Sequence, residues 1–365
     1  MPGHDIVLAT TVAMTIEAFL QPVGRELVRR GHRVHLVCGD REPRTDFPNT
    51  TTVLPMTRST AGTQDLRSLN AWVTYLRQVQ PRMVVAGTPK ASLLAMTAAR
   101  IARTPARVYV LHGAVWDGAT GLRRRVLEAA ERATIAASTT QIAVSDSLAR
   151  LVRARGLARH QPRVVGSGSF CGVDTDRFRP TAVRDDRTPT MVFVGRLNRD
   201  KGIDALLRVL DSVRQRVDAR LLIVGGLDET SPPDDATMRA VVDRPQVEWV
   251  GEQADVLPFL QASDLLLFPT RREGLPQVPL EAQACGVPVV SWRVTGVIDA
   301  VRDGFTGVLV PFGDEPALAA AAAELLADEP ARARMAQNAR GWVEDRFNES
   351  LVATANADFL ESCAG

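Results

Sequence analysis

The chain has 365 residues, of which 45% are hydrophobic and 24% are charged, a composition typical of globular proteins with about two domains. These values exclude a disordered chain, a collagen-like chain and a small disulfide scaffold. The net charge of +2 conceals an asymmetry, because residues 1–180 carry 25 basic and 13 acidic side chains and residues 181–365 carry 19 and 29. An anionic partner of the first half would explain this asymmetry, and so would drift in composition between two domains.

Apolar runs alternate with amphipathic stretches along the first half, as in a parallel sheet covered by helices. Gly31 marks the end of the first helix, and Ser145 or Asp146 is suited to cap the last one. The predicted strands are 6–10, 34–38, 83–86, 108–111 and 141–144, and the predicted helices are 17–30, 91–103, 122–137 and 147–155.

A polar, proline-bracketed segment, residues 175–189, interrupts this alternation and is typical of a linker. The alternation then restarts, with a helix at 203–213, a largely helical last 50 residues, and strands at 191–194, 220–224, 247–250, 265–268, 287–291 and 307–310. The pattern predicts an α/β fold with two doubly wound, Rossmann-like domains. We expect an N-terminal domain at 1–180, a C-terminal domain at 181–345, and a terminal helix at 346–365 that packs back on the first domain.

No uncharged run in the first half is long enough to span a membrane, and the N-terminus lacks the basic region of a secretory signal. The four cysteines lie far apart without a CxxC pair, which argues against a zinc site and a disulfide framework. We therefore expect a cytoplasmic protein without a metal site.

The segment 273–281, EGLPQVPLE, carries two acidic residues eight positions apart, directly after the apolar strand 265–268. Pro279 suits the first turn of a following helix, where its missing N–H is no loss. Residues 274–278 then present main-chain N–H groups and the positive end of a helix to one point. This predicts an anion site suited to a diphosphate.

Two acidic residues flank this predicted anion site. Glu281 is placed to accept hydrogen bonds from a pair of hydroxyls, and Glu273 to reach another part of the same ligand. The alternative is that both are solvated carboxylates, with Glu281 stabilised by the helix dipole.

A second cluster, Gly195-Arg196 followed by Lys201-Gly202, also stands at the end of a predicted strand. Two cations at this position can neutralise charge on a leaving phosphate. Lys201 and Lys90 are the only lysines among 44 basic residues, which favours a role for a compact point charge. The alternative is an ordinary charged surface loop.

These motifs, in this order, resemble the retaining glycosyltransferases of family 4, which have the GT-B fold and use nucleotide sugars without a metal. Gly31-His32, Ser145 in VSDSL, Gly172-Val-Asp174 and Thr306-Gly307 extend the resemblance over nearly the whole chain. The loop 10–15, with Gly87-Thr-Pro-Lys90 and His112-Gly113, is similar to the branch that builds capsular or lipid-linked saccharides.

The resemblance implies a role for each matching residue. Arg196 and Lys201 hold the donor diphosphate, Glu281 binds the ribose, Glu273 binds the sugar, and His112 lies beside the transferred sugar. The remaining donor-binding positions are Gly195, Gly274, Leu275, Gln277 and Val278, together with Thr11, whose hydroxyl replaces the glycines that many family members have in this loop.

The implied reaction moves a hexosyl unit from a nucleotide sugar, preferably a UDP-sugar, to an acceptor hydroxyl, without any cofactor. The departing phosphate takes the proton of the acceptor. The acceptor meets the basic first domain, where Lys90 and the run Arg123, Arg124 and Arg125 face either an anionic lipid surface or solvent. The lack of a recognised motif and the 5% aromatic content disfavour a nucleic-acid partner.

Four alternatives stay open from the sequence. The first is a glycosyltransferase of small-molecule or antibiotic biosynthesis. The second is a nucleotide-sugar epimerase or a phosphorylase with the same fold. The third is a nucleotide-sugar binder without turnover. The fourth, a nicotinamide dehydrogenase, is disfavoured because no GxGxxG follows the first strand.

Overall fold

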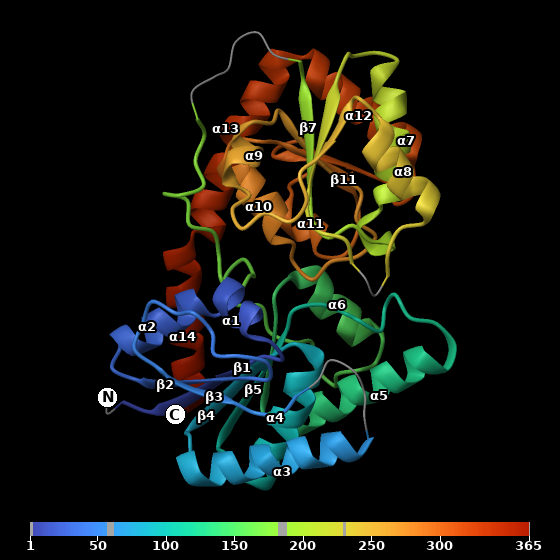
Figure 1. The fold of residues 1–365 in the computed structure, drawn as a ribbon. Coiled ribbons are helices and arrows are strands. Elements are labelled where there is room, and N and C mark those ends of the chain that lie inside the picture. The colour runs from blue at the N-terminus through green and yellow to red at the C-terminus, as the bar shows by residue number, and fades with distance from the viewer. Residues whose placement is uncertain (1–2, 57–61, 182–187, 229–230, 365) are drawn as a thin grey trace. The chain divides into compact units, whose positions relative to one another are not determined.

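The computed structural model describes residues 3–56, 62–181, 188–228 and 231–364. The chain forms two compact units, the first from residues 1–172 with 349–365 and the second from residues 173–348 (Figure 1). The chain therefore passes between the units at 172/173 and 348/349, whereas the sequence places the boundaries at 180/181 and 345/346. Residues 182–187 of the expected linker lie outside the described residues.

The first unit contains a parallel six-stranded sheet of order β3-β2-β1-β4-β5-β6. Its strands are β1 (Asp5–Ala9), β2 (Arg33–Cys38), β3 (Thr50–Val53), β4 (Met83–Gly87), β5 (Ala106–Leu111) and β6 (Thr140–Ala143). The sequence pattern misses β3, because this edge strand reads TTTV and none of its residues is fully buried. An edge strand needs no continuous apolar run, so periodicity alone does not reveal it.

One helix that the sequence predicts in the first unit is two separate helices in the structure. Residues 17–30 were expected as one helix, but α1 ends at Phe19 and α2 begins at Gln21. Pro22 lies in the first turn of α2, where its missing N–H is tolerated, although it would break a continuous helix. The helices of the first unit are α1 (Ala13–Phe19), α2 (Gln21–Arg29), α3 (Gly62–Val79), α4 (Pro89–Ile101), α5 (Gly121–Ala137), α6 (Asp146–Ala154) and α14 (Glu349–Ala364). Ser145 caps α6, as expected, by accepting a hydrogen bond from the N–H of Leu148.

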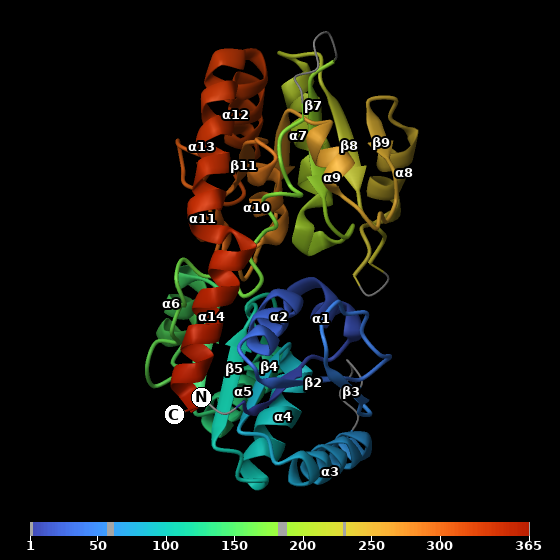
Figure 2. The same cartoon turned by 90° about the vertical axis from the view of Figure 1, so that its left-hand side faces the viewer.

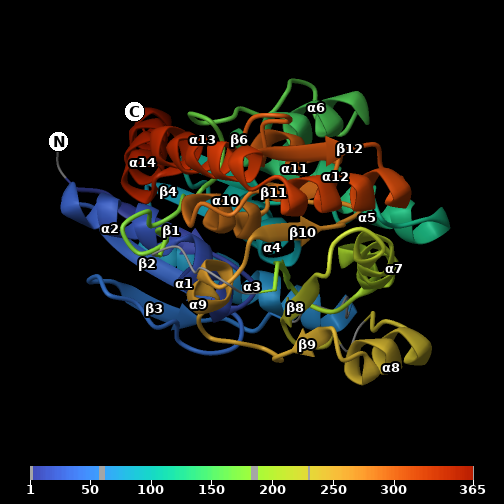
Figure 3. The same cartoon turned by 90° about the horizontal axis from the view of Figure 1, so that it is seen from above.

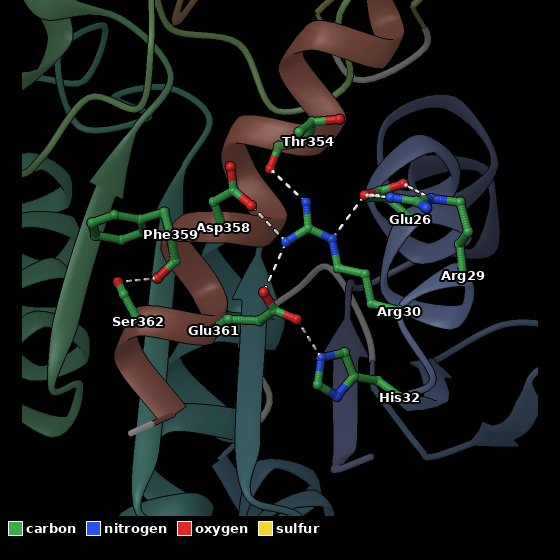
Figure 4. A network of polar contacts seen from close by, with 9 residues as sticks. All are labelled: Glu26, Arg29, Arg30, His32, Thr354, Asp358, Phe359, Glu361 and Ser362. Atoms are coloured by element: carbon green, nitrogen blue, oxygen red, sulfur yellow. Dashed lines mark hydrogen bonds and ion pairs between the residues drawn. The ribbon is translucent and has the colours of Figure 1, made fainter. Parts of the chain in front are cut away.

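The terminal helix α14 packs against α2 of the first unit (Figure 2). Figure 4 shows the polar network that holds it there. Arg30 donates to the carboxylates of Asp358 and Glu361 at 2.6 and 2.8 Å. His32 accepts from a main-chain N–H at Nδ1, so its Nε2 carries the proton and donates to Glu361 at 2.9 Å. These half-buried and exposed contacts hold the last helix on the first unit.

The second unit also contains a parallel six-stranded sheet, of order β12-β11-β10-β7-β8-β9. Strands β12 and β9 lie at its opposite edges (Figure 3). The strands are β7 (Thr190–Val194), β8 (Arg220–Val224), β9 (Val247–Trp249), β10 (Leu265–Phe268), β11 (Val289–Trp292) and β12 (Gly307–Val310). The six strands predicted from apolar runs are all present.

Helices cover both faces of this second sheet, and each face has its own core. Alternate strand residues, such as Phe193 and Val194, belong to opposite cores, as the period of a strand requires. The helical elements are η1 (Arg199–Lys201), α7 (Ile203–Arg214), α8 (Asp235–Asp243), α9 (Leu257–Gln261), α10 (Gln277–Ala284), α11 (Val297–Ala300), α12 (Glu315–Ala327) and α13 (Glu329–Phe347). Within the described part of the chain, no helix is long and apolar enough to cross a membrane.

Candidate active site

The site of the second unit begins with two loops that are hydrogen-bonded to each other at the carboxyl end of the sheet. One loop follows β7 and the other follows β10. The N–H of Arg271 donates to the carbonyl of Asp200 at 2.8 Å. Gly202 has φ +72°, and a Cβ there would lie 2.0 Å from the carbonyl oxygen of Pro269. Only glycine therefore permits this close approach of the two loops.

This close approach brings together two predicted site residues that are 72 positions apart. Nζ of Lys201 lies 2.5 Å from Oε1 of Glu273, and the hydroxyl of Thr270 donates to the same oxygen at 2.9 Å. Lys201 also lies over the ring of Phe268, 5.6 Å from its centroid. The side chains of Lys201 and Glu273 remain 23% and 14% exposed, so a ligand can reach both.

Arg196 lies in the loop that follows β7, on the same side of the sheet as Lys201. A Cβ at Gly195 would be 4.0 Å from Cδ of Lys201, so the lysine side chain passes directly beside this loop. The Arg196 side chain is 64% exposed, and its Nη1 donates to Oδ2 of Asp228 at 2.7 Å. Both cations are thus held by carboxylates within one part of the second unit.

The expected anion loop forms the start of α10. Pro276 occupies the N-cap position without a side-chain cap hydrogen bond. The side chains of Leu275 and Val278 pack against the core, so only their main-chain groups are suited to a ligand. Gly274 lies close to Gly296, whose Cβ would be 2.5 Å from the Gly274 carbonyl oxygen. The main-chain groups of this loop and the positive end of α10 are therefore suited to an anion.

Glu281 is half-buried and lies in the second turn of α10, whereas the sequence places it in the first turn. The helix begins at Gln277, so Glu281 is its fifth residue. Burial raises the pKa of Glu281 to about 7, with a smaller opposing effect of Arg177. Its carboxylate has no hydrogen-bond or ion-pair partner among the described residues. A half-buried acceptor of this kind is suited to ligand hydroxyls.

His112 belongs to the first unit and directly follows β5. Burial lowers its pKa to about 4, so the imidazole is neutral at physiological pH. Its ring contacts Phe19 and Phe170, and its buried Nε2 has no hydrogen-bond partner in the described chain. A Cβ at Gly87 would lie 2.5 Å from that nitrogen, so the glycine makes room for the ring.

The remaining candidates of the first unit make internal contacts. Thr11 is 5% exposed, and its hydroxyl lies 2.9 Å from that of Thr88 and accepts from the N–H of Ala91. It therefore connects the β1 loop to the start of α4. Lys90 is 12% exposed and pairs with Asp65 of α3, so its ammonium group is held by a carboxylate of the first unit.

The arginine run begins in the first turn of α5 (Figure 1). Arg124 forms an ion pair with Glu128 one turn further along the helix, with its Nε 3.0 Å from the carboxylate. Arg123 and Arg125 are exposed. Leu122 and Val126, on the same helix, are 76% and 54% exposed.

Sequence reasoning missed three polar residues that support the site. Thr270 holds Glu273, Asp228 holds Arg196, and Asn198 caps η1 by accepting from the N–H of Lys201 at 2.9 Å. The spacing of Asn198 to Lys201 is a cap signal that could have been read. Nothing in the sequence distinguishes Asp228 from other loop acids.

The chemistry of the donor set is that of an anion site. Two cations, a helix start and a hydroxyl acceptor favour a diphosphate bound to a polyol. Among the residues that the structure describes, no group of three or more His, Cys, Asp or Glu side chains is placed to hold a metal ion. Cys285 lies one helical turn beyond Glu281, and burial raises the pKa of its thiol to about 12, which disfavours the reactive thiolate.

Comparison with family models identifies both halves of the chain. Residues 174–342 match the model described as glycosyl transferases group 1, and residues 16–177 match the model described as glycosyltransferase family 4. The two matches meet near the boundary of the two units.

Curated relatives and solved structures agree with these matches. A capsular polysaccharide biosynthesis glycosyltransferase of Staphylococcus aureus is 30% identical, over 96% of this chain and 95% of that protein. A GDP-mannose-dependent phosphatidylinositol monomannoside mannosyltransferase of Mycolicibacterium smegmatis is 37% identical over 52% of this chain and 54% of that protein. The fold is similar to that of sucrose-phosphate synthase from Thermosynechococcus elongatus, with a TM-score of 0.82 and 21% identity over 98% of each chain. It is also similar to that of HepE from Anabaena in complex with UDP and glucose, with a TM-score of 0.81 and 18% identity over 98% of this chain and 100% of that chain.

Proposed function

This chain belongs to the family 4 glycosyltransferases with the GT-B fold, and on that premise we propose that it transfers a hexosyl unit from a nucleotide sugar to an acceptor hydroxyl with retention of configuration. The observation that carries this proposal is the joined pair of loops in the second unit. They bring Lys201 to Glu273 at 2.5 Å, and the Lys201 side chain passes beside Gly195, the residue before Arg196. The start of α10 and the unpartnered, half-buried Glu281 complete the set for a diphosphate and a ribose.

The proposed reaction uses these residues for positioning and charge stabilisation. The acceptor oxygen attacks the anomeric carbon while the bond from that carbon to the diphosphate oxygen breaks. The acceptor proton goes to the departing diphosphate, whose charge Arg196 and Lys201 stabilise. Glu273 orients the sugar hydroxyls, and the family resemblance assigns the neutral imidazole of His112 a hydrogen bond to the transferred sugar. No metal is required.

A UDP-hexose is the preferred donor, and GDP-mannose is the second donor to test because the Mycolicibacterium relative is named as dependent on it. The proposed acceptor is a glycan of polysaccharide biosynthesis, as the name of the Staphylococcus relative suggests, attached to a lipid at the inner face of the membrane. Transfer to a small-molecule acceptor, epimerisation and binding without turnover are the alternatives that product analysis distinguishes.

The experiment is a thermal-shift screen of nucleotide sugars, followed by mass spectrometry of reactions with lipid-phosphate, glycan and small-molecule acceptors, in buffer with EDTA. We expect a product heavier by one hexosyl unit, and NMR of its anomeric position should show the same α- or β-configuration as the donor. Loss of activity in EDTA would refute the metal-independent site, and an inverted product would refute retention. A converted nucleotide sugar without an acceptor product would indicate an epimerase instead.

We also propose that the start of α5 contacts anionic lipid. Leu122 and Val126 are separated by one turn and form an exposed apolar strip, and the exposed Arg123 and Arg125 flank it. Apolar insertion combined with phosphate contacts is the usual requirement for surface binding.

We expect the protein to co-sediment with vesicles that contain phosphatidylglycerol but not with pure phosphatidylcholine vesicles. Replacing Leu122 and Val126 by Ser should lower the bound fraction several-fold, as should 0.5 M salt. Val242→Ser, which removes another exposed apolar side chain of 64% exposure in the second unit, is the matched control. Equal binding to both vesicle types would contradict the proposal.

A further inference from the structure

Asp228 is a buried acid at the edge of the donor site that the proposed reaction does not use. Its residue exposure is 7%. A single oxygen, Oδ2, accepts two hydrogen bonds, from Nη1 of Arg196 at 2.7 Å and from Nδ2 of Asn198 at 3.0 Å. A buried carboxylate requires such partners, because an uncompensated charge at this position would be costly.

The main chain fixes Asp228 relative to Arg196. Gly195 donates to the carbonyl of Val224, and Leu197 donates to that of Gly226, both at 2.9 Å. The N–H of Asp228 donates back to the carbonyl of Leu197 at 3.2 Å. The loops that follow β7 and β8 are therefore paired on both sides of Arg196, so the carboxylate is a fixed anchor for the guanidinium.

Asn198 extends this anchor to the other cation of the site. Its Nδ2 donates to Asp228, while its Oδ1 accepts from the N–H of Lys201 and caps η1. One polar chain thus runs from Asp228 through Asn198 to the turn that carries Lys201. Of the two cations, only Arg196 contacts Asp228 directly, so the effect of a change at Asp228 should pass chiefly through Arg196.

The Arg196 side chain is 64% exposed, so its conformation is not fixed by packing. The ion pair engages Nη1, and the other guanidinium nitrogens can bind two phosphate oxygens in the geometry that arginine favours. We propose that Asp228 is a positioning residue that orients Arg196 toward the donor diphosphate. This inference rests on the proposed function and adds to it a residue that governs the efficiency of the donor site.

The test is a double-mutant cycle of wild type, Asp228→Asn, Arg196→Ala and the double variant. Asn keeps the shape and one acceptor oxygen for Asn198 but removes the charge that holds the guanidinium. We expect Asp228→Asn to lower kcat/KM about tenfold, as for other residues that orient a ligand-binding group. In the Arg196→Ala background the same substitution should change kcat/KM less than twofold, because its target is gone.

Two further readouts keep the outcome decisive. The control for unfolding temperature is Asp264→Asn, which alters another Asp of the second unit. Asp264 directly precedes β10, accepts a hydrogen bond from the N–H of Thr190 and is remote from the site loops. Affinity for UDP, measured by calorimetry over the same four proteins, gives a second cycle that needs no turnover. Equal effects of Asp228→Asn in both backgrounds would show a merely structural role and overturn the inference.

Failure of the proposed function has a different signature. If wild type binds UDP but transfers no sugar, the reaction is wrong while the calorimetric cycle still decides the role of Asp228. If Arg196→Ala leaves both UDP affinity and transfer unchanged, Arg196 does not bind the diphosphate, and the inference about Asp228 is overturned as well.

Discussion

Lys201→Ala should lower kcat for hexosyl transfer about 10²–10³-fold while changing KM for the nucleotide sugar much less. The ammonium group lies 2.5 Å from Glu273, and the charge on the diphosphate grows as the glycosidic bond breaks. An interaction that strengthens in the transition state affects kcat more than ground-state binding. Steady-state kinetics with varied donor concentration measures this separation.

The fold of the variant can be checked with the other lysine of the chain. Lys90 is also half-buried and paired with a carboxylate, that of Asp65, so Lys90→Ala reports what loss of such a pair does to the unfolding temperature. Both variants should unfold within a few degrees of wild type. If added methylammonium restores part of the turnover of Lys201→Ala, the missing group is the charge. Wild-type turnover in Lys201→Ala would contradict the proposed role.

Glu281→Gln should weaken binding of a nucleotide sugar about 10–100-fold at pH 8. The half-buried carboxylate has no protein partner among the described residues, and ribose hydroxyls would supply the missing donors. Hydrogen bonds to a charged acceptor are worth about 1.5–3 kcal/mol. Calorimetry with the intact nucleotide sugar is the suitable measurement, because its diphosphate does not change charge between pH 6 and pH 8.

The pH dependence of binding follows from the same group. Burial raises the pKa of Glu281 to about 7, and hydroxyl donors favour the ionised form. The affinity of wild type should therefore rise between pH 6 and pH 8, whereas that of Glu281→Gln should be flat. The same slope in both proteins would assign the pH dependence to another group.

Glu281→Gln should also raise the free energy of unfolding of the ligand-free protein by about 1–2 kcal/mol at pH 8. This figure is reduced because water reaches part of the carboxylate and screens its charge. The folded pKa of about 7 exceeds the ordinary value of 4.5, so the folded state binds more protons between these values. The contribution of Glu281 to the free energy of unfolding is therefore complete below pH 4.5 and is lost as the pH rises through 7. Denaturant unfolding at pH 5 and pH 8 should show the gain only at pH 8.

The site holds each of its two cations on a carboxylate. Lys201 is paired with Glu273 and Arg196 with Asp228. A diphosphate that enters must share or replace these acceptors. The hydroxyl of Thr270, which is fully buried and donates to Glu273 at 2.9 Å, would keep that carboxylate in place when Lys201 turns to phosphate.

The amino-acid sequence by itself determined the two parallel sheets and the elements that carry the donor residues. Apolar runs of strand length and helical periodicity are local properties, so both sheets and the strands before Arg196 and Glu273 could be predicted from them. The edge strand β3 and the break at Pro22 were missed because each depends on a weak or ambiguous local signal.

Tertiary structure alone decided which side chains meet. The contact of Lys201 with Glu273 spans 72 positions, and it depends on the close approach of Gly202 to Pro269 rather than on any spacing in the sequence. The pairing of Lys90 with Asp65, the anchor that Asp228 gives Arg196, and the return of α14 to the first unit are of the same kind. Periodicity fixes the face on which a residue lies, whereas charge pairing and burial depend on distances through space, which only the folded chain sets.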